Sequence, residues 1–218
     1  PRLKEARAED VDWAEFLHDR PDRPFDPWVF TGWMGHREFS DGAVPGYGSH
    51  FIDLVQYFTG AGAPESCVCL GGTYVWRDEY GFTSPDTVQA VWHYREGFQV
   101  AYSTCFCNDS GDTFRVFGSS AMMNLDDWFR FGASPEFYVT TAGAGKPDGR
   151  KNDRVPVEPV DRPDHMRNWL DCLRNGGTPH ASIDDGYNHS VAVIMAMEAY
   201  DRGCRVRYDP TYRELIDV

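Results

Sequence analysis

Long apolar runs are missing from this sequence. No stretch approaches the roughly 18 uncharged apolar residues that a membrane-spanning helix requires, and no basic segment precedes an apolar one near the N-terminus. Neither a membrane span nor a secretory leader is therefore expected. We predict a cytoplasmic protein that does not interact with membranes.

Basic residues are also in short supply. The chain has 21 Lys and Arg against 34 Asp and Glu, which gives a formal net charge of -13. Proteins that bind nucleic acid neutralise its phosphates with a basic patch, which scattered cations among excess acids do not form. We therefore exclude nucleic acid as a partner, and an anionic membrane surface for the same reason.

Cysteines are too few for a disulfide scaffold, because six in 218 residues favour reduced thiols. Four of them form two C-x-C pairs, Cys67 with Cys69 and Cys105 with Cys107, and each pair places both thiols on one face of a strand. If those strands are neighbours, the thiols converge on a zinc ion. Structural zinc sites usually use C-x2-C turns, and cysteine is a common small buried residue. A plain sheet face is therefore favoured, and a metal-bound domain stays as an alternative.

A nucleotide-binding motif is absent as well. A dinucleotide site combines a strand, a G-x-G-x-x-G turn and a helix within about 30 residues. The nearest match, Gly143-Ala144-Gly145, is followed by a polar loop and lacks the third glycine. We predict that this chain alone binds neither NAD nor NADP. No G-x-S-x-G or H-E-x-x-H motif supports hydrolytic chemistry either.

The pattern of apolar residues indicates a single α+β domain over residues 1–218. Residues 1–48 are rich in Pro, Asp and aromatic residues, which predicts an irregular arm with one short helix near residues 11–18, and residues 49–218 form the body. Helical spacing predicts helices over 49–58, 162–175 and 184–202, the first two capped by Ser49 and Asp161.

A period of two, joined by short turn-like connections, predicts antiparallel strands. They span residues 66–76, 86–94, 98–106, 113–118, 121–125 and 205–208. Residues 141–153 read as a polar surface loop. We therefore predict an open, mainly antiparallel sheet with helices packed on one face.

The two faces of this sheet differ in composition. The bulky face should lie under the helices and carries Val68, Leu70, Tyr74, Trp76, Val88, Trp92, Tyr94, Val100 and Tyr102. The other face is small, flat and nearly uncharged, with Cys67, Cys69, Thr73, Val75, Thr87, Gln89, Val91, His93, Gln99, Ala101, Ser103 and Cys105. Such a composition suits a partner sheet, so we predict a homodimer or tetramer through it. The alternative is that the arm or the 141–153 loop covers this face.

His50 and Asp53 form the best chemical candidate. Their spacing of three residues puts both side chains on one face of the first long helix. A histidine with a carboxylate neighbour can hold or deprotonate a sugar hydroxyl near neutral pH. The alternative is a histidine at a helix end beside a solvated aspartate.

Weaker candidates for substrate binding are Trp33, His165 and His189. Sugar rings stack on the flat faces of aromatic side chains, although aromatic residues in an arm more often fasten it to its own domain. We assign the fastening role to Trp13 and Phe16 and leave Trp28 and Trp33 open. The two histidines lie on the C-terminal helices without compact ligand spacing, so they also fit helix-end or core-rim positions.

Several short motifs follow one another along nearly the whole chain. They are Pro24-Phe25-Asp26-Pro27, His50-x-x-Asp53-Leu54, Gly71-Gly72-Thr73-Tyr74, Pro85-Asp86-Thr87, His165-x-x-Asn168-Trp169-Leu170-Asp171-Cys172-Leu173-Arg174, His189-Ser190 and Asp209-Pro210. In order and spacing they resemble the C-terminal domain of the Gfo/Idh/MocA oxidoreductases, the family of glucose-fructose oxidoreductase and inositol dehydrogenase. The resemblance implies a GAPDH-like C-terminal fold that docks on a Rossmann half, which this chain lacks, holding NAD or NADP.

The same resemblance implies a substrate that is a sugar, cyclitol or derivative, and a catalytic role for His50. His50 matches the histidine of the family's D-x-x-x-H motif, but the aspartate of that motif falls on Gly46. The family's catalytic lysine belongs to the Rossmann half, so we expect this chain alone to be inactive. The leading function is the substrate-binding and oligomerisation domain of an NAD(P)-dependent oxidoreductase. Gly46 keeps open a stand-alone, non-catalytic carbohydrate-binding or scaffold module.

Overall fold

The computed structural model describes residues 6–108, 111–119, 121–125, 138–140, 154–156 and 163–218. The chain forms two compact units, one of Pro1–Asn108 with Ile183–Val218 and one of Asp109–Ser182. That residues 1–218 form a single domain stays a prediction. The predicted loop at 141–153 and the predicted cap Asp161 lie outside the described residues. No helix of the described part combines the length and apolarity that crossing a bilayer needs.

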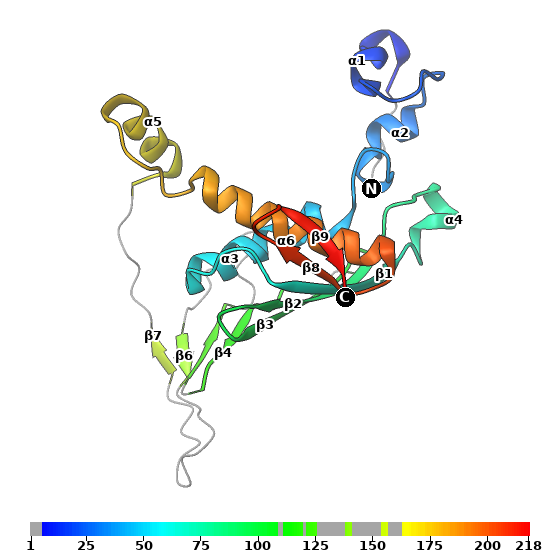
Figure 1. The fold of residues 1–218 in the computed structure, drawn as a ribbon. Coiled ribbons are helices and arrows are strands. Elements are labelled where there is room, and N and C mark those ends of the chain that lie inside the picture. The colour runs from blue at the N-terminus through cyan, green and yellow to red at the C-terminus, as the bar shows by residue number, and fades with distance from the viewer. Residues whose placement is uncertain (1–5, 109–110, 120, 126–137, 141–153, 157–162) are drawn as a thin grey trace. The chain divides into compact units, whose positions relative to one another are not determined.

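A five-stranded sheet forms the first unit's centre, in the order β3-β2-β1-β8-β9 (Figure 1). Its strands are β1 (Ser66–Gly72), β2 (Thr87–Tyr94), β3 (Phe98–Cys105), β8 (Val206–Asp209) and β9 (Glu214–Asp217). All neighbouring pairs are antiparallel. The predicted sheet is therefore confirmed, with β9 as an additional strand.

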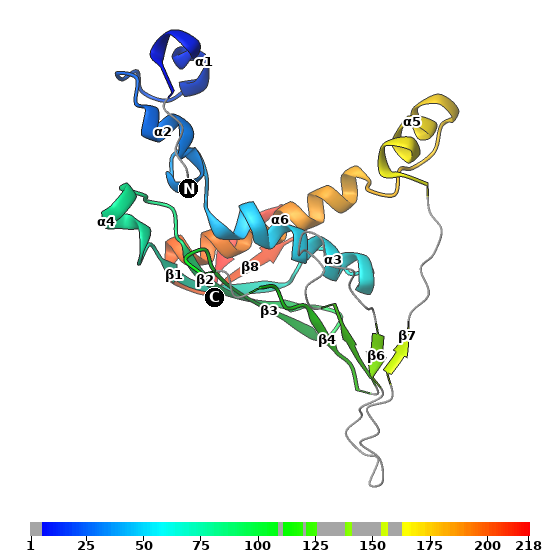
Figure 2. The same cartoon turned by 180° about the vertical axis from the view of Figure 1, so that it is seen from behind.

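Two helices cover one face of this sheet, as predicted (Figures 1 and 2). They are α3 (Ser49–Thr59) and α6 (Ile183–Arg202). The indole N–H of Trp92 in β2 donates a hydrogen bond of 2.8 Å to the carbonyl of Ala192 in α6. Phe51 of α3 packs against Tyr102 of β3 with ring centroids 6.1 Å apart. The core of this unit therefore lies between the two helices and β1 to β3.

The face of β1 that packs against the helices is the opposite of the one predicted. Cys67 pairs with Trp92 and Val68 with Val91 across the sheet. Cys67 and Cys69 are buried, whereas Val68 and Leu70 are 43% and 77% exposed. The prediction ranked the faces by bulk, but α6 packs on β1 with buried alanines, and so close a helix accommodates small side chains.

On β2 and β3 the predicted faces are confirmed. The buried side chains include Val88, Trp92, Tyr94 and Tyr102. The alternate positions Gln89, Val91, Gln99, Ala101 and Ser103 are exposed. After the correction to β1, the sheet's open face is more apolar than predicted.

The start of α3 also differs from the prediction. A turn of π-helix, η3 (Val44–Gly48), runs directly into α3. Ser49 lies inside the helix, after Gly48 with helical dihedrals, so its predicted cap role is wrong. The predicted end is confirmed, because Gly60 adopts the left-handed conformation with a φ of 67°.

The N-terminal arm contains more helical turns than the single helix predicted. These are η1 (Ala8–Asp10), α1 (Trp13–Leu17), α2 (Pro27–Thr31) and η2 (Trp33–Gly35). The Asp26 side chain accepts hydrogen bonds from the N–H groups of Trp28 and Val29, and Pro27 occupies the first helical position, where its missing N–H costs nothing. Trp13 stacks on Phe16 at 5.2 Å, and Phe16 stacks on Phe39 at 4.9 Å. Trp13 and Phe16 therefore pack against aromatic rings of the arm itself, and their predicted role in fastening the arm to the body stays a prediction.

A further short helix, α4 (Trp76–Tyr80), replaces the end of the strand predicted over 66–76. The second unit contains a four-stranded antiparallel sheet and α5 (His165–Asn175). Its strands are β4 (Arg115–Phe117), β5 (Met122–Asn124), β6 (Tyr138–Thr140) and β7 (Arg154–Pro156). α5 begins after Asp164, whose carboxylate accepts the N–H groups of Met166 and Arg167.

Candidate functional site

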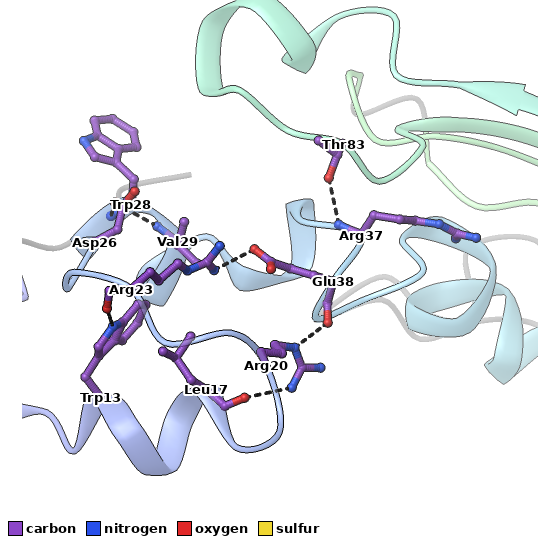
Figure 3. Close-up of polar contacts among 10 residues, drawn as sticks. All are labelled: Trp13, Leu17, Arg20, Arg23, Asp26, Trp28, Val29, Arg37, Glu38 and Thr83. Carbon is purple, nitrogen blue, oxygen red and sulfur yellow. Dashed lines mark hydrogen bonds and ion pairs between the residues drawn. The ribbon is translucent and has the colours of Figure 1, made fainter.

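Two arginines of the arm, Arg20 and Arg23, bind Glu38 in the segment that follows α2 (Figure 3). The guanidinium of Arg20 donates a 2.6 Å hydrogen bond to the carbonyl of Glu38. The guanidinium of Arg23 reaches the Glu38 carboxylate at 2.6 Å. Glu38 is therefore fixed through both its backbone and its side chain.

Arg37 ties the same segment to the body of the first unit. Its backbone N–H donates to the Thr83 hydroxyl at 2.8 Å. Its guanidinium lies 2.9 Å from the Asp41 carboxylate and also bonds the carboxylate of Asp201 in α6. Two acids thus neutralise this one cation.

These residues border an open cavity of about 490 Å³. Of the described residues, its walls comprise Arg20, Trp33, Met34, Arg37, Glu38, Phe39, Ser40, Asp41, Pro45 and Gly46. A cavity of this size accommodates a small organic molecule. Because the charges of Arg37 and Glu38 are paired, the cavity offers neutral polar groups beside an aromatic ring rather than an excess of positive charge. That combination suits a polyhydroxylated ligand better than a phosphate.

Gly46 lies in the cavity wall within η3, and His50 follows it by four residues in α3. A π-helical turn holds more residues than an α-helical turn, so positions four apart come to nearly the same side. His50 is exposed, and the ring of Tyr47 meets it edge-on at a centroid distance of 6.4 Å. The predicted histidine thus stands one turn from the cavity.

The other predicted site residues are placed as follows. Trp33 is 44% exposed and lines the cavity. Asp53 is exposed on α3, one turn after His50. His189 is half-buried on α6, and His165 opens α5 in the second unit. Of the five predicted site residues, Trp33 is therefore the one that lines the cavity, and the roles of all five stay predictions.

Sequence reasoning missed the polar wall of the cavity. Arg37, Glu38 and Asp41 belong to a stretch that reads as irregular, and the partners Asp201 and Thr83 lie far away in the chain. The alternation of charges in this short stretch was the only local signal. It did not show which residues pair.

His36 lies beside the cavity segment and faces inward. Its ring packs edge-on against Phe82 at 5.5 Å, and its Nε2 atom is buried without a hydrogen-bond partner among the described residues. Burial lowers the pKa of this imidazole, and the Glu38 and Asp26 charges oppose that shift. The neutral form is therefore favoured in the folded protein.

The two C-x-C pairs do not come together. β2 separates β1 from β3 in the sheet. Cys67 pairs with Trp92 near one end of β2, whereas Cys105 pairs with Thr87 at the other end. The convergence of four thiols on zinc, kept as an alternative, is therefore ruled out by the strand order. Within the described residues, no group of three metal-ligating side chains is found.

Comparison with known proteins extends this description. A family model of the GFO/IDH/MocA C-terminal domain matches residues 12–124. Among curated proteins, no sequence matches this chain.

Several solved structures share the fold. A putative NADPH-dependent oxidoreductase from Desulfitobacterium hafniense has 18% identity and a TM-score of 0.64, over 80% of this chain and 51% of that one. An aldose-aldose oxidoreductase from Caulobacter crescentus complexed with glycerol has 18% identity and a TM-score of 0.63, over 80% of this chain and 50% of that one. The WlbA dehydrogenase from Bordetella pertussis in complex with NADH and UDP-GlcNAcA has 18% identity and a TM-score of 0.60, over 86% of this chain and 52% of that one.

The chain thus spans about half the length of each of these structures. At such low identity the likeness establishes the fold alone. The family model is the stronger finding, because it matches more than half of the chain. This chain belongs to the GFO/IDH/MocA C-terminal domain family.

Proposed function

We propose that this chain, as one domain over residues 1–218, binds substrate and mediates oligomerisation in an NAD(P)-dependent oxidoreductase. Its substrate is a sugar, a cyclitol or a derivative. The observation that carries the proposal is the position of His50, one turn after Gly46 in the cavity wall of a chain that belongs to this family. The solved relatives named above add support, since they include an aldose-aldose oxidoreductase and a dehydrogenase in complex with NADH and UDP-GlcNAcA.

The residues described here do not fit a dinucleotide. A pyrophosphate site needs a strand, a glycine-rich turn and a helix N-terminus in one parallel β-α-β unit. Every strand pair in the described part of the chain is antiparallel. We therefore assign NAD or NADP to the other half of such an enzyme and derive no step through it.

The chain's own residues supply binding and proton handling in this proposal. Trp33 offers a flat apolar face to a sugar ring, and Ser40 and Asp41 offer oxygens to its hydroxyl groups. His50 holds or accepts the proton of the reacting hydroxyl, and Asp53 on the same helical face orients the imidazole. His189 contributes to the substrate pocket from α6, and the substrate-binding role of His165 stays a prediction from the sequence.

The open face of the sheet is the proposed oligomer contact. Val68, Val91 and Ala101 lie in one cross-strand row, and Leu70 stands in the next row. Val68, Leu70 and Val91 are all exposed. Exposed apolar side chains that adjoin one another across strands in this way favour packing against the same face of a second copy about a two-fold axis. The proposed assembly is a homodimer or a tetramer built from it.

Substrate binding is tested with the full-length protein that contains this chain. Reduced nicotinamide should appear with members of a panel of aldoses, cyclitols and nucleotide sugars. Trp33→Leu should raise KM more than it lowers kcat, because a stacking face contributes to binding. The matched control is Trp28→Leu, another exposed tryptophan of the arm, which does not line the cavity among the described residues. Equal KM values for both variants would remove Trp33 from the site.

A second candidate is a stand-alone, non-catalytic carbohydrate-binding or scaffold module. The observation that favours it is Gly46, which has no side chain at the motif's aspartate position. A Cβ atom there would lie 3.3 Å from the flexible methyl end of Met34, so an aspartate can be accommodated. If the full-length protein binds a sugar but turns none over, and Gly46→Asp then creates turnover, the module is the better description.

A further inference from the structure

The backbone of the cavity's polar wall is fixed by the segment that leads into β2. The carbonyl of Gly35 accepts the N–H groups of Thr83 and Ser84 at 2.8 and 2.9 Å. The Ser84 hydroxyl donates to the carbonyl of Ser40 at 2.6 Å. None of these three bonds involves a charged side chain. They should therefore persist when an ion pair of the wall is removed.

The Arg37 guanidinium, in contrast, is shared between two carboxylates. Its Nη2 atom donates a hydrogen bond to the carboxylate of Asp201, near the end of α6. Its Nη1 atom lies 2.9 Å from a carboxylate oxygen of Asp41, but without the geometry of a hydrogen bond. The guanidinium carbon also lies 5.9 Å from the ring centroid of Tyr200, the preceding residue of α6. Arg37 is therefore directed toward α6, and Asp41 is the weaker of its two partners.

Asp41 consequently keeps its capacity to accept hydrogen bonds. Its side chain is 52% exposed where it lines the cavity, and it accepts no hydrogen bond from another described residue. A guanidinium and a carboxylate prefer two parallel N–H···O bonds, which would occupy both oxygens of Asp41. Because Nη2 is bonded to Asp201, Arg37 does not form this pair with Asp41.

We propose that Asp201 is a positioning residue for sugar binding. It holds the Arg37 guanidinium against α6, and so leaves the Asp41 carboxylate open to a hydroxyl group of the ligand. Among the described residues, those that line the cavity do not include Asp201, which therefore acts through Arg37. Asp201 has this role only if the cavity binds a sugar, so the inference rests on the proposed function.

Sugar binding by the full-length protein tests this role. The dissociation constant, KM and kcat are measured with the best sugar of the panel, by calorimetry and by steady-state kinetics. Asp201→Asn should raise the dissociation constant and KM by about tenfold, roughly the contribution of one hydrogen bond to a charged group, and leave kcat unchanged. Asp201→Glu should restore most of the affinity, because a carboxylate again faces Arg37.

Two further variants separate this role from a general effect of charge. Glu198→Gln removes the same charge from the same helix, but Glu198 pairs with Arg202, so this variant should bind sugar like the wild type. In an Arg37→Met background, Asp201→Asn should have no further effect, because Asp201 acts through Arg37. Equal weakening by Asp201→Asn and Glu198→Gln would overturn the proposal, and so would a further loss in the Arg37→Met background.

Amide hydrogen exchange distinguishes positioning from a merely structural role. The exchange of residues 35–41 should be the same in Asp201→Asn and in the wild type, because the bonds to Thr83 and Ser84 remain. Faster exchange there would mean that Asp201 holds the wall itself, and would overturn the proposal. A wild-type affinity for Asp201→Asn would overturn this inference alone. A wild-type protein that binds no sugar would overturn the proposed function and this inference with it.

Discussion

Asp86 is the carboxylate on which the loop between β1 and β2 depends. It is 2% exposed and accepts three consecutive backbone N–H groups, from Tyr74, Val75 and Trp76, at 2.9 to 3.1 Å. The Thr87 hydroxyl donates to its other oxygen at 2.9 Å. Burial alone would raise the pKa of this carboxyl, but the hydrogen bonds together hold it below its usual value.

Asp86→Asn should therefore lower the free energy of unfolding by about 2 kcal/mol. The amide oxygen of asparagine is a weaker acceptor than a carboxylate oxygen, and its NH₂ group cannot accept a hydrogen bond in place of the second oxygen. Urea denaturation measures the change. Asp78→Asn, on the exposed side of α4, is the control and should stay near the wild-type value. A wild-type urea midpoint for the Asp86 variant would mean that water can replace the carboxylate as hydrogen-bond acceptor for the N–H groups of this loop.

His36 predicts a pH dependence of stability. Its pKa is lowered by burial, so the unfolded chain takes up a proton near pH 6.5 while the folded chain takes it up only at lower pH. Between these values the unfolded state binds more protons, and the free energy of unfolding falls as the pH falls. His36→Gln should flatten this slope between about pH 7 and pH 5. Parallel slopes for wild type and His36→Gln would contradict the assignment.

Among the elements, β1 shows what sequence patterns can and cannot establish. Its period of two follows from alternation, whereas the short turn that predicts antiparallel pairing joins β2 to β3, and β1 reaches β2 through the segment that contains α4. Its inward face does not, because the choice between Cys67 and Val68 depends on how closely α6 approaches. The same limit applies to the site: His50 and Trp33 were recognisable from motifs, whereas the pairing of Arg37 with Asp201 depends on tertiary contact alone.

The same substitution, glycine to alanine, at one position in β1 and one in α6 tests how closely β1 packs against β2. A Cβ atom on Gly71 in β1 would lie 2.5 Å from the carbonyl oxygen of Thr87, whereas one on Gly186 in α6 would meet nothing within 4 Å. Gly71→Ala should thus lower the free energy of unfolding by about 2 kcal/mol. Gly186→Ala should raise it by about 0.5–1 kcal/mol, since alanine favours a helix. Equal effects in urea denaturation would show that β1 and β2 are more loosely paired than described.

At the scale of the whole molecule, the open sheet face predicts self-association. Val91 and Ala101 are directly opposite each other. Val91→Arg with Ala101→Glu places opposite charges on this pair, which can bond within one chain while they prevent a dry interface. Light scattering at micromolar concentration should report a dimer or tetramer for the wild type and a monomer for the double variant. Ile194→Arg, at an exposed position of α6, should keep the wild-type mass.

A wild-type protein that is monomeric at that concentration would remove the oligomer proposal. So would a double variant that stays associated. The substrate proposal would survive either result, because the cavity is lined by residues of one chain.

The central claim is that His50 handles the proton of a sugar hydroxyl. The most direct measurement is the kcat of the full-length protein with its best sugar substrate, for wild type and for His50→Ala. The account predicts a fall of roughly 10²-fold or more, the usual contribution of a positioned acid or base. His180→Ala, an exposed histidine of the second unit, should retain full activity. A folded His50→Ala enzyme with wild-type kcat would contradict the account.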